Sequence, residues 1–112
     1  MQERRQAAWI GGSVWVKGNV VSKGDLIIDG KVEGTIDLAD HSLTIGETAT
    51  VVADLVARHV TISGTVSGNV IGTAKVELKK SASVEGDITA PSFAMEDGAV
   101  LSGKVDTGAR SG

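Results

Sequence analysis

The sequence predicts an all-β fold, a single parallel β-helix in which a repeat of about 17 residues forms one three-faced coil. Three observations predict it. A unit of apolar residue, any residue, glycine, any residue and apolar residue occurs six times, once with alanine for glycine. The segments alternate with a period of two and are rich in Val, Ile and Thr, as strands are. The copies begin 16, 19, 15, 18 and 17 residues apart, which is too short for helical repeats or propeller blades.

Two interleaved units define about six coils. The glycine units are Val16–Val20, Val32–Ile36, Val51–Leu55, Val66–Val70, Val84–Ile88 and Leu101–Val105. A second apolar unit precedes the last five of them, at Leu26–Ile28, Leu43–Ile45, Val60–Ile62, Val76–Leu78 and Phe93–Met95. The interleaving indicates short strands joined by tight corners, and stacking at about 4.8 Å gives a prism roughly 25 to 30 Å tall.

The middle residue of each glycine unit is predicted to face the core, because period-two alternation puts it on the same side as its apolar neighbours. A column of small residues would leave room for larger side chains from the opposite wall. The column consists of Gly18, Gly34, Ala53, Gly68, Gly86 and Gly103. Glycine can also serve as a turn residue with positive φ, and this role is predicted for Gly24, Gly46 and Gly98. In the longer corners after the second unit, a small inward residue is expected at Ala49, Ala82 and Ala99.

One domain is expected, at residues 13–107, between an N-terminal tail at 1–12, flexible or membrane-contacting, and a disordered C-terminal tail at 108–112. The net charge of −3 gives no basic field for nucleic acid. The chain lacks cysteine, a signal peptide and an apolar run long enough to cross a bilayer. We therefore expect a cytoplasmic protein, soluble or at most peripheral at a membrane.

Residues for catalysis, a cofactor or a metal are not found. His41 and His59 are the only histidines, fewer than the three of a catalytic zinc site. Glu85 and Asp87 share the outer side of one predicted strand, where nothing apolar surrounds them. No phosphate-binding loop is present. We expect a protein that is not an enzyme and binds neither a cofactor nor a metal.

Self-assembly is the function that the pattern favours, because no helical or charged cap covers either end of the predicted β-helix. Four sets of residues are candidates for contacts. The C-end interface is predicted at Phe93, Met95, Leu101 and Val105, and the N-end interface at Val14, Val16 and Val20. Outward apolar residues predict either lateral contacts between filaments or a docking surface at Trp15, Val21, Val52, Val56 and Ile71. Candidate membrane contacts are Arg4, Arg5, Trp9 and Ile10. The alternative for this segment is that Trp9 merely covers the first coil.

The motifs "LTIGE", "VTISGTVSGNV" and "GAVLSGKV", with six glycine units in this order, resemble those of the bactofilin family over roughly residues 13–107. The resemblance implies a right-handed three-faced β-helix that polymerises end to end, without nucleotide, into non-polar cytoskeletal filaments. It also implies a scaffold for cell-wall or morphogenetic proteins at the bacterial inner membrane. The alternative is a discrete β-helical binding module, a monomer or a dimer, that forms no filaments.

Overall fold

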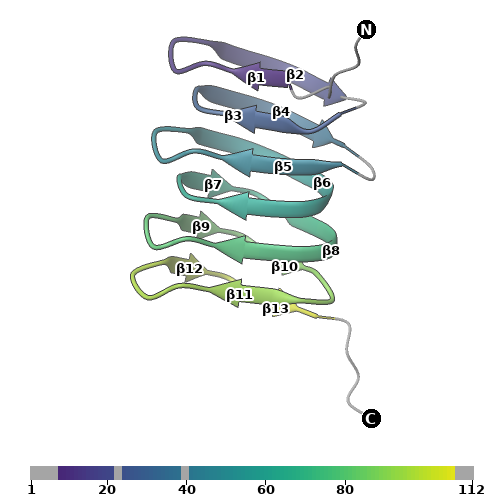
Figure 1. Cartoon of the computed structure of the whole chain (residues 1–112), viewed down its shortest axis with the longest axis vertical. Helices are drawn as coiled ribbons and strands as arrows, with labels where there is room; N and C mark the ends of the chain where they lie inside the picture. The colour runs from purple at the N-terminus through teal and green to yellow at the C-terminus, as the bar shows by residue number, and fades with distance from the viewer. Residues whose placement is uncertain (1–7, 22–23, 39–40, 108–112) are drawn as a thin grey trace, which may run out of the picture.

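A computed structural model describes residues 8–21, 24–38 and 41–107, and these residues form strands and turns without a helix (Figure 1). The strands are β1 (Ala8–Ile10), β2 (Trp15–Val21), β3 (Leu26–Ile28), β4 (Lys31–Asp37), β5 (Ser42–Ile45), β6 (Thr50–Ile62), β7 (Thr65–Ser67), β8 (Val70–Leu78), β9 (Ser83–Glu85), β10 (Ile88–Thr89), β11 (Phe93–Met95), β12 (Val100–Ser102) and β13 (Val105–Asp106).

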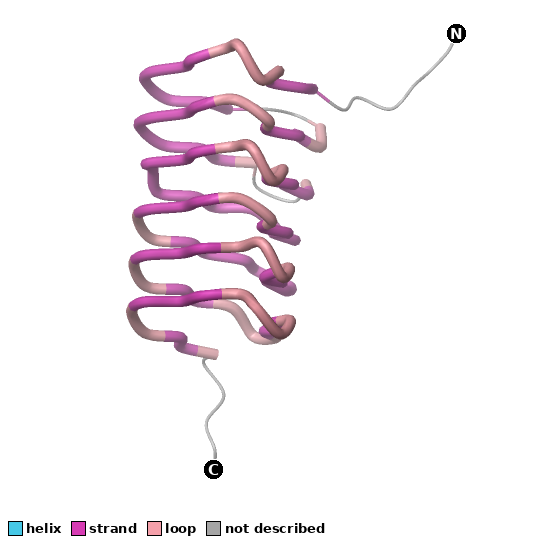
Figure 2. The backbone as a smooth tube through the Cα atoms, turned by 90° about the vertical axis from the view of Figure 1, so that its left-hand side faces the viewer, coloured by secondary structure: helices cyan, strands magenta, loops and turns pink. Residues whose placement is uncertain are grey.

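Every pairing among these strands is parallel, and equivalent positions of successive coils lie in register. In one ladder Leu43 pairs with both Leu26 and Val60. Val60 then pairs with Val76, and Val76 with Phe93. The chain is therefore a stack of coils about 17 residues apart, as Figure 2 shows along the length of the molecule. This arrangement confirms the predicted parallel β-helix and its repeat length.

Each coil contributes to three faces. Face A is the ladder of β1, β3, β5, the end of β6, the end of β8, and β11. Face B precedes the glycine column and contains residues 15–17, 31–33 and 50–52, followed by β7, β9 and β12. Face C follows the column and contains residues 20–21, 36–37, 55–57 and 70–72, followed by β10 and β13. We number the layers one to six from the N-terminus.

The small-residue column is in register, but only Ala53 is buried in the core as predicted, and the glycines do not share that orientation. Gly18 pairs with Gly34, and Gly34 with Ala53. Gly34 is exposed rather than buried. The chain bends at Gly68, which separates β7 from β8 and has a φ of 136°. The column therefore lies at the corner between faces B and C, where a straight strand's alternation no longer applies.

Glycine is needed at this corner for a reason other than space in the core. Gly34 and Gly68, with φ of 131° and 136°, adopt a backbone conformation that side chains disfavour. A Cβ atom added to Gly68 would also collide with the backbone of Ala53 in the layer before, and one added to Gly34 with that of Gly18. Positive φ is thus found at these corner glycines and, as predicted, at Gly98, whereas the same prediction was wrong for Gly46.

The core is a continuous stack of aliphatic side chains between the three faces. Among the described residues every buried side chain is apolar. The longer corners behave as predicted: Ala49 and Ala82 are buried, and Ala99 packs against the core. A backbone hydrogen bond closes each of the three corners, from the N–H of Ala49, Ala82 and Ala99 to the carbonyl of Gly46, Lys79 and Glu96 respectively.

The β-helix begins earlier than the expected boundary at residue 13. Strand β1 pairs with β3 over its whole length, with Ile10 opposite Ile28. The side chain of Ile10 packs against the core. Residues 8–10 therefore belong to the first layer and not to a tail. The remainder of the expected tails, residues 1–7 and 108–112, lies outside the described residues.

Candidate polymerisation interfaces

The predicted C-end residues lie together in layer six, on β11, β12 and β13. Each continues an inward column of the core, and the described residues cover each of them on one side only. Met95 is 44% exposed, whereas Leu78, its partner in layer five, is fully buried. Phe93, Leu101 and Val105 are partly buried and pack against the same core. This end of the β-helix thus presents a layer of core side chains that is half covered.

The ladder of backbone hydrogen bonds between layers also ends at layer six within the described residues. Gly86 N–H donates to the Ser102 carbonyl, and Ile88 N–H to the Lys104 carbonyl, each one layer further along. The equivalent acceptors for Gly103 and Val105 would belong to a seventh layer. A second chain placed here could continue both the backbone ladder and the apolar core.

The N-end layer is the counterpart at the other end. Val16 and Val20 of β2 pair with Val32 and Ile36 and continue their inward columns. Both are partly buried and pack against the core, and so does Ile10 of β1, which the sequence analysis assigned to a membrane contact. Val14 lies before β2, at the corner, and is 46% exposed. The first layer is therefore also half covered.

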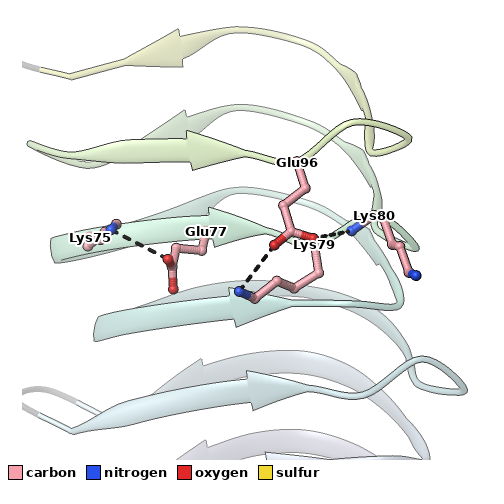
Figure 3. Close-up of polar contacts among 5 residues, drawn as sticks. All are labelled: Lys75, Glu77, Lys79, Lys80 and Glu96. Carbon is pink, nitrogen blue, oxygen red and sulfur yellow. Dashed lines mark hydrogen bonds and ion pairs between the residues drawn. The ribbon is translucent and has the colours of Figure 1, made fainter.

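Charged side chains cluster near the C-end of face A (Figure 3). The Glu96 carboxylate lies 3.5 Å from Lys79 Nζ and accepts a hydrogen bond from the Lys80 N–H, which joins layer six to layer five. Lys75 and Glu77 form a second ion pair at 3.4 Å on the same face. The side chains of both pairs are partly exposed, and such pairs contribute little to stability. The contacts of Glu96 attach the last corner to layer five.

The predicted lateral residues do not form one surface. Trp15, 57% exposed, and Val52 point outward on face B. Val21, 75% exposed, and Ile71 point outward on face C, and there Val56 is half-buried. Of the five, only Val56 and Ile71 are paired in register. Trp15 has two amines over its ring, since Lys17 Nζ and Lys31 Nζ each lie 4.7 Å from the centroid.

A shallow hollow lies outside the glycine corner, between faces B and C. It has a volume of about 440 Å³ and is lined by Gly34, Val52, Ala53, Asp54, Ser67 and Gly68. The hollow exists because the corner carries hydrogen or methyl groups in place of larger side chains. Sequence reasoning missed it, since it placed the column inside the core.

Titratable side chains form no catalytic constellation among the described residues. Glu85 and Asp87 do not share one side of a strand, because the chain bends at Gly86 between them. His41 Nδ1 lies 4.0 Å from the Asp25 carboxylate on the surface. In the described ranges no three His, Asp or Glu side chains are grouped as a metal site. The same ranges contain no helix long and apolar enough to cross a membrane.

The stacked coils, aliphatic core and half-covered end layers define a parallel β-solenoid, a repeat protein in which each unit packs on its neighbours. The chain belongs to the bactofilin family, described as polymer-forming and cytoskeletal, whose model matches residues 8–106.

Two relatives from Myxococcus xanthus (strain DK1622) are similar to it. Bactofilin BacO is 41% identical over 97 residues, which are 87% of this chain and 76% of that protein. Bactofilin BacP is 34% identical over 99 residues, which are 88% of this chain but only 41% of that protein. No solved structure matches the chain significantly.

Proposed function

We propose that this protein is a scaffold that self-assembles end to end into non-polar filaments without nucleotide. The half-covered end layers carry the proposal. Covering a Leu, Met or Phe side chain fully is worth about 1.5–3 kcal/mol relative to full exposure. Four partly covered side chains at the C-end therefore offer several kcal/mol per junction, with backbone pairing in addition. Non-polarity comes from the family resemblance, which joins N-end to N-end and C-end to C-end.

The C-end contact can be tested with Phe93→Arg. The ring lies in the last layer and pairs with Val76 beneath it, so a charged side chain there would meet its own copy across a symmetric junction. We expect short species, dimers joined at the N-ends, with an unchanged β circular-dichroism spectrum. Ala94→Arg is the matched control. Ala94 pairs with Glu77, whose side chain points outward, so an arginine at position 94 adds the same charge to the side of the filament and not to its end.

Negative-stain electron microscopy of the wild-type protein and both variants is the measurement. Long filaments in the Phe93→Arg variant would remove the C-end junction from the proposal. A wild-type protein that stays monomeric or dimeric at every concentration would favour the alternative, a discrete β-helical binding module.

We also propose that the scaffold positions cell-wall or morphogenetic proteins at the bacterial inner membrane. The support is the N-terminal segment, in which Arg4 and Arg5 precede Trp9. Arg4 and Arg5 lie outside the described residues, while Ile10 is part of the first layer. The membrane contact is therefore proposed for residues 1–7, with Trp9 in the adjoining strand. Catalysis has no part in this proposal.

A further inference from the structure

The inward side chains of a coil follow an order of sizes that is the same in both directions. Face A contributes two large side chains, and around the rest of the coil large and small side chains alternate. In layer three the buried residues, taken from face A onward, are Leu43, Ile45, Ala49, Val51, Ala53, Leu55 and Ala57. Layer five has the same order of sizes in Val76, Leu78, Ala82, Val84, Gly86, Ile88 and Ala90.

This order gives each coil two equivalent halves. In layer three the dividing line runs from the middle of face A, at Thr44, to the corner between faces B and C, at Ala53. Faces B and C each contribute one large side chain, and Ala49 and Ala57 are the small residues on either side of face A. A line through the middle of face B would instead relate face A, with two large side chains, to face C, with one.

Layer six keeps the order and directs backbone groups away from the stack. Phe93 and Met95 lie on face A, with Leu101 on face B and Val105 on face C. The Val76 N–H donates to a carbonyl of layer six, and Phe93 holds the equivalent place one layer further along. The inward residues of layer six therefore present both their side chains and their backbone groups to the next layer.

We propose that two chains join at their C-ends about a two-fold axis that passes through Ala94, in the middle of face A, and through the corner at Gly103. Strand β11 then pairs antiparallel with β11 of the second copy, with Phe93 opposite Met95. Face B of each chain continues into face C of the other, with Leu101 opposite Val105. This inference rests on the proposed non-polar assembly and adds the axis and the residues that meet.

Packing favours this axis over the alternatives. It sets face A against face A and sets the single large side chains of faces B and C against each other, as close packing requires. An axis through face B or face C would place Phe93 and Met95 against a face with one large inward side chain. At the opposite corner Gly103 has no side chain, so the two backbones can approach each other there.

Ala94 meets its own copy on this axis. The neighbours Phe93 and Met95 exchange the backbone hydrogen bonds, so the two Ala94 residues form a non-hydrogen-bonded antiparallel pair with Cα atoms about 4.5 Å apart. That separation lies within the range of a disulfide. Ala94 pairs with outward Glu77, so its side chain also points outward. Two arginines at position 94 can therefore diverge into solvent, whereas two cysteine thiols can join.

Disulfide cross-linking tests the axis, because the chain contains no cysteine of its own. Filaments of Ala94→Cys are oxidised with copper phenanthroline and analysed on a non-reducing gel. We expect most of the chain to become a covalent dimer. A mixture of Ser102→Cys and Lys104→Cys chains should also form dimers, since face B meets face C, and each of these variants alone should form far fewer. Adding Phe93→Arg to Ala94→Cys should remove the dimer together with the junction.

Two other mixtures report the other axes. Dimers from Val100→Cys with Ser102→Cys would place the axis on face B, and dimers from Lys104→Cys with Asp106→Cys would place it on face C. Either result overturns the inference. An Ala94→Cys dimer that survives the addition of Phe93→Arg also overturns it, because the cross-link would then join the sides of filaments.

Electron microscopy of the same samples separates this inference from the proposed function. Filaments in which Ala94→Cys does not cross-link overturn the inference alone. Ala94→Cys dimers in samples without filaments support the C-end contact and overturn the continuous assembly.

Discussion

Replacing selected glycines by alanine separates two contributions to the free energy of unfolding. One is the cost of a positive φ, and the other is the cost of a clash between the new Cβ atom and the neighbouring layer; both occur at Gly68. Gly68→Ala would place a side chain on a backbone with φ of 136° and would drive its Cβ into the backbone of Ala53. Gly18 has the same unusual backbone, with φ of 119°, but a Cβ added there meets nothing within 4 Å. Gly11 has neither constraint, since its Cβ also meets nothing within 4 Å.

The three substitutions are expected to change the free energy of unfolding by different amounts. A residue held in a disfavoured backbone conformation costs about 1–3 kcal/mol, which is the expectation for Gly18→Ala. Gly68→Ala adds the displacement of a neighbouring strand, for which overpacking costs of about 1–3 kcal/mol are typical, so the total is roughly 2–6 kcal/mol. Gly11→Ala should lie near zero or stabilise slightly, because alanine reduces the entropy of the unfolded chain.

Urea denaturation followed by circular dichroism, at concentrations below filament assembly, measures the three free energies of unfolding. Equal losses for Gly18→Ala and Gly68→Ala would show that the backbone conformation alone matters and that the clash is relieved without cost. A Gly68→Ala variant as stable as the wild type would refute the corner geometry itself.

Three other changes test separate parts of the molecule. Ala49→Leu should destabilise the fold by about 1–3 kcal/mol in the same assay, because Ala49 is buried at a tight corner, and an unaffected midpoint would contradict that packing. Glu96→Gln should change stability by under about 1 kcal/mol, since its ion pair with Lys79 is exposed, and a larger loss would mean that this contact orders the last layer. Removing residues 1–7 should preserve filaments and reduce pelleting with anionic liposomes, whereas removing residues 1–10 also deletes β1 and should disturb the N-end layer. Equal pelleting of the full-length and the shorter chains would exclude the membrane contact.

The sequence alone predicted the stacking, the register and the inward residues, because both apolar units repeat at nearly constant spacing. Val32 and Ile36 are buried as expected, and so are Leu43 and Ile45. The orientation of Gly34 could not be predicted by alternation, which assumes a straight strand and fails where the chain bends. A stronger clue was available, since a column almost purely of glycine suggests a backbone conformation rather than a lack of space.

The first layer and the surfaces were harder to predict. Strand β1 was missed because residues 8–10 precede the glycine units, although Ile10 stands 18 positions before Ile28, which is one repeat. The set of neighbours on face C depends on which outward residues share a face after the bend. Val56 and Asp37 become neighbours only through the register of β4 and β6, which are separate segments of the chain.

Because each coil packs only on the coils beside it, opening of the structure is expected to begin at the two half-covered layers and to move inward. Amide hydrogens of β11 and β13 should therefore exchange with solvent faster than those in the middle of β6. A protomer bound at an end layer prevents opening from beginning there. Assembly should therefore slow amide hydrogen exchange throughout the chain. It should also make the resistance of the protein to unfolding rise with protein concentration. The half-covered end layers thus couple the lifetime of each folded chain to the presence of its neighbours.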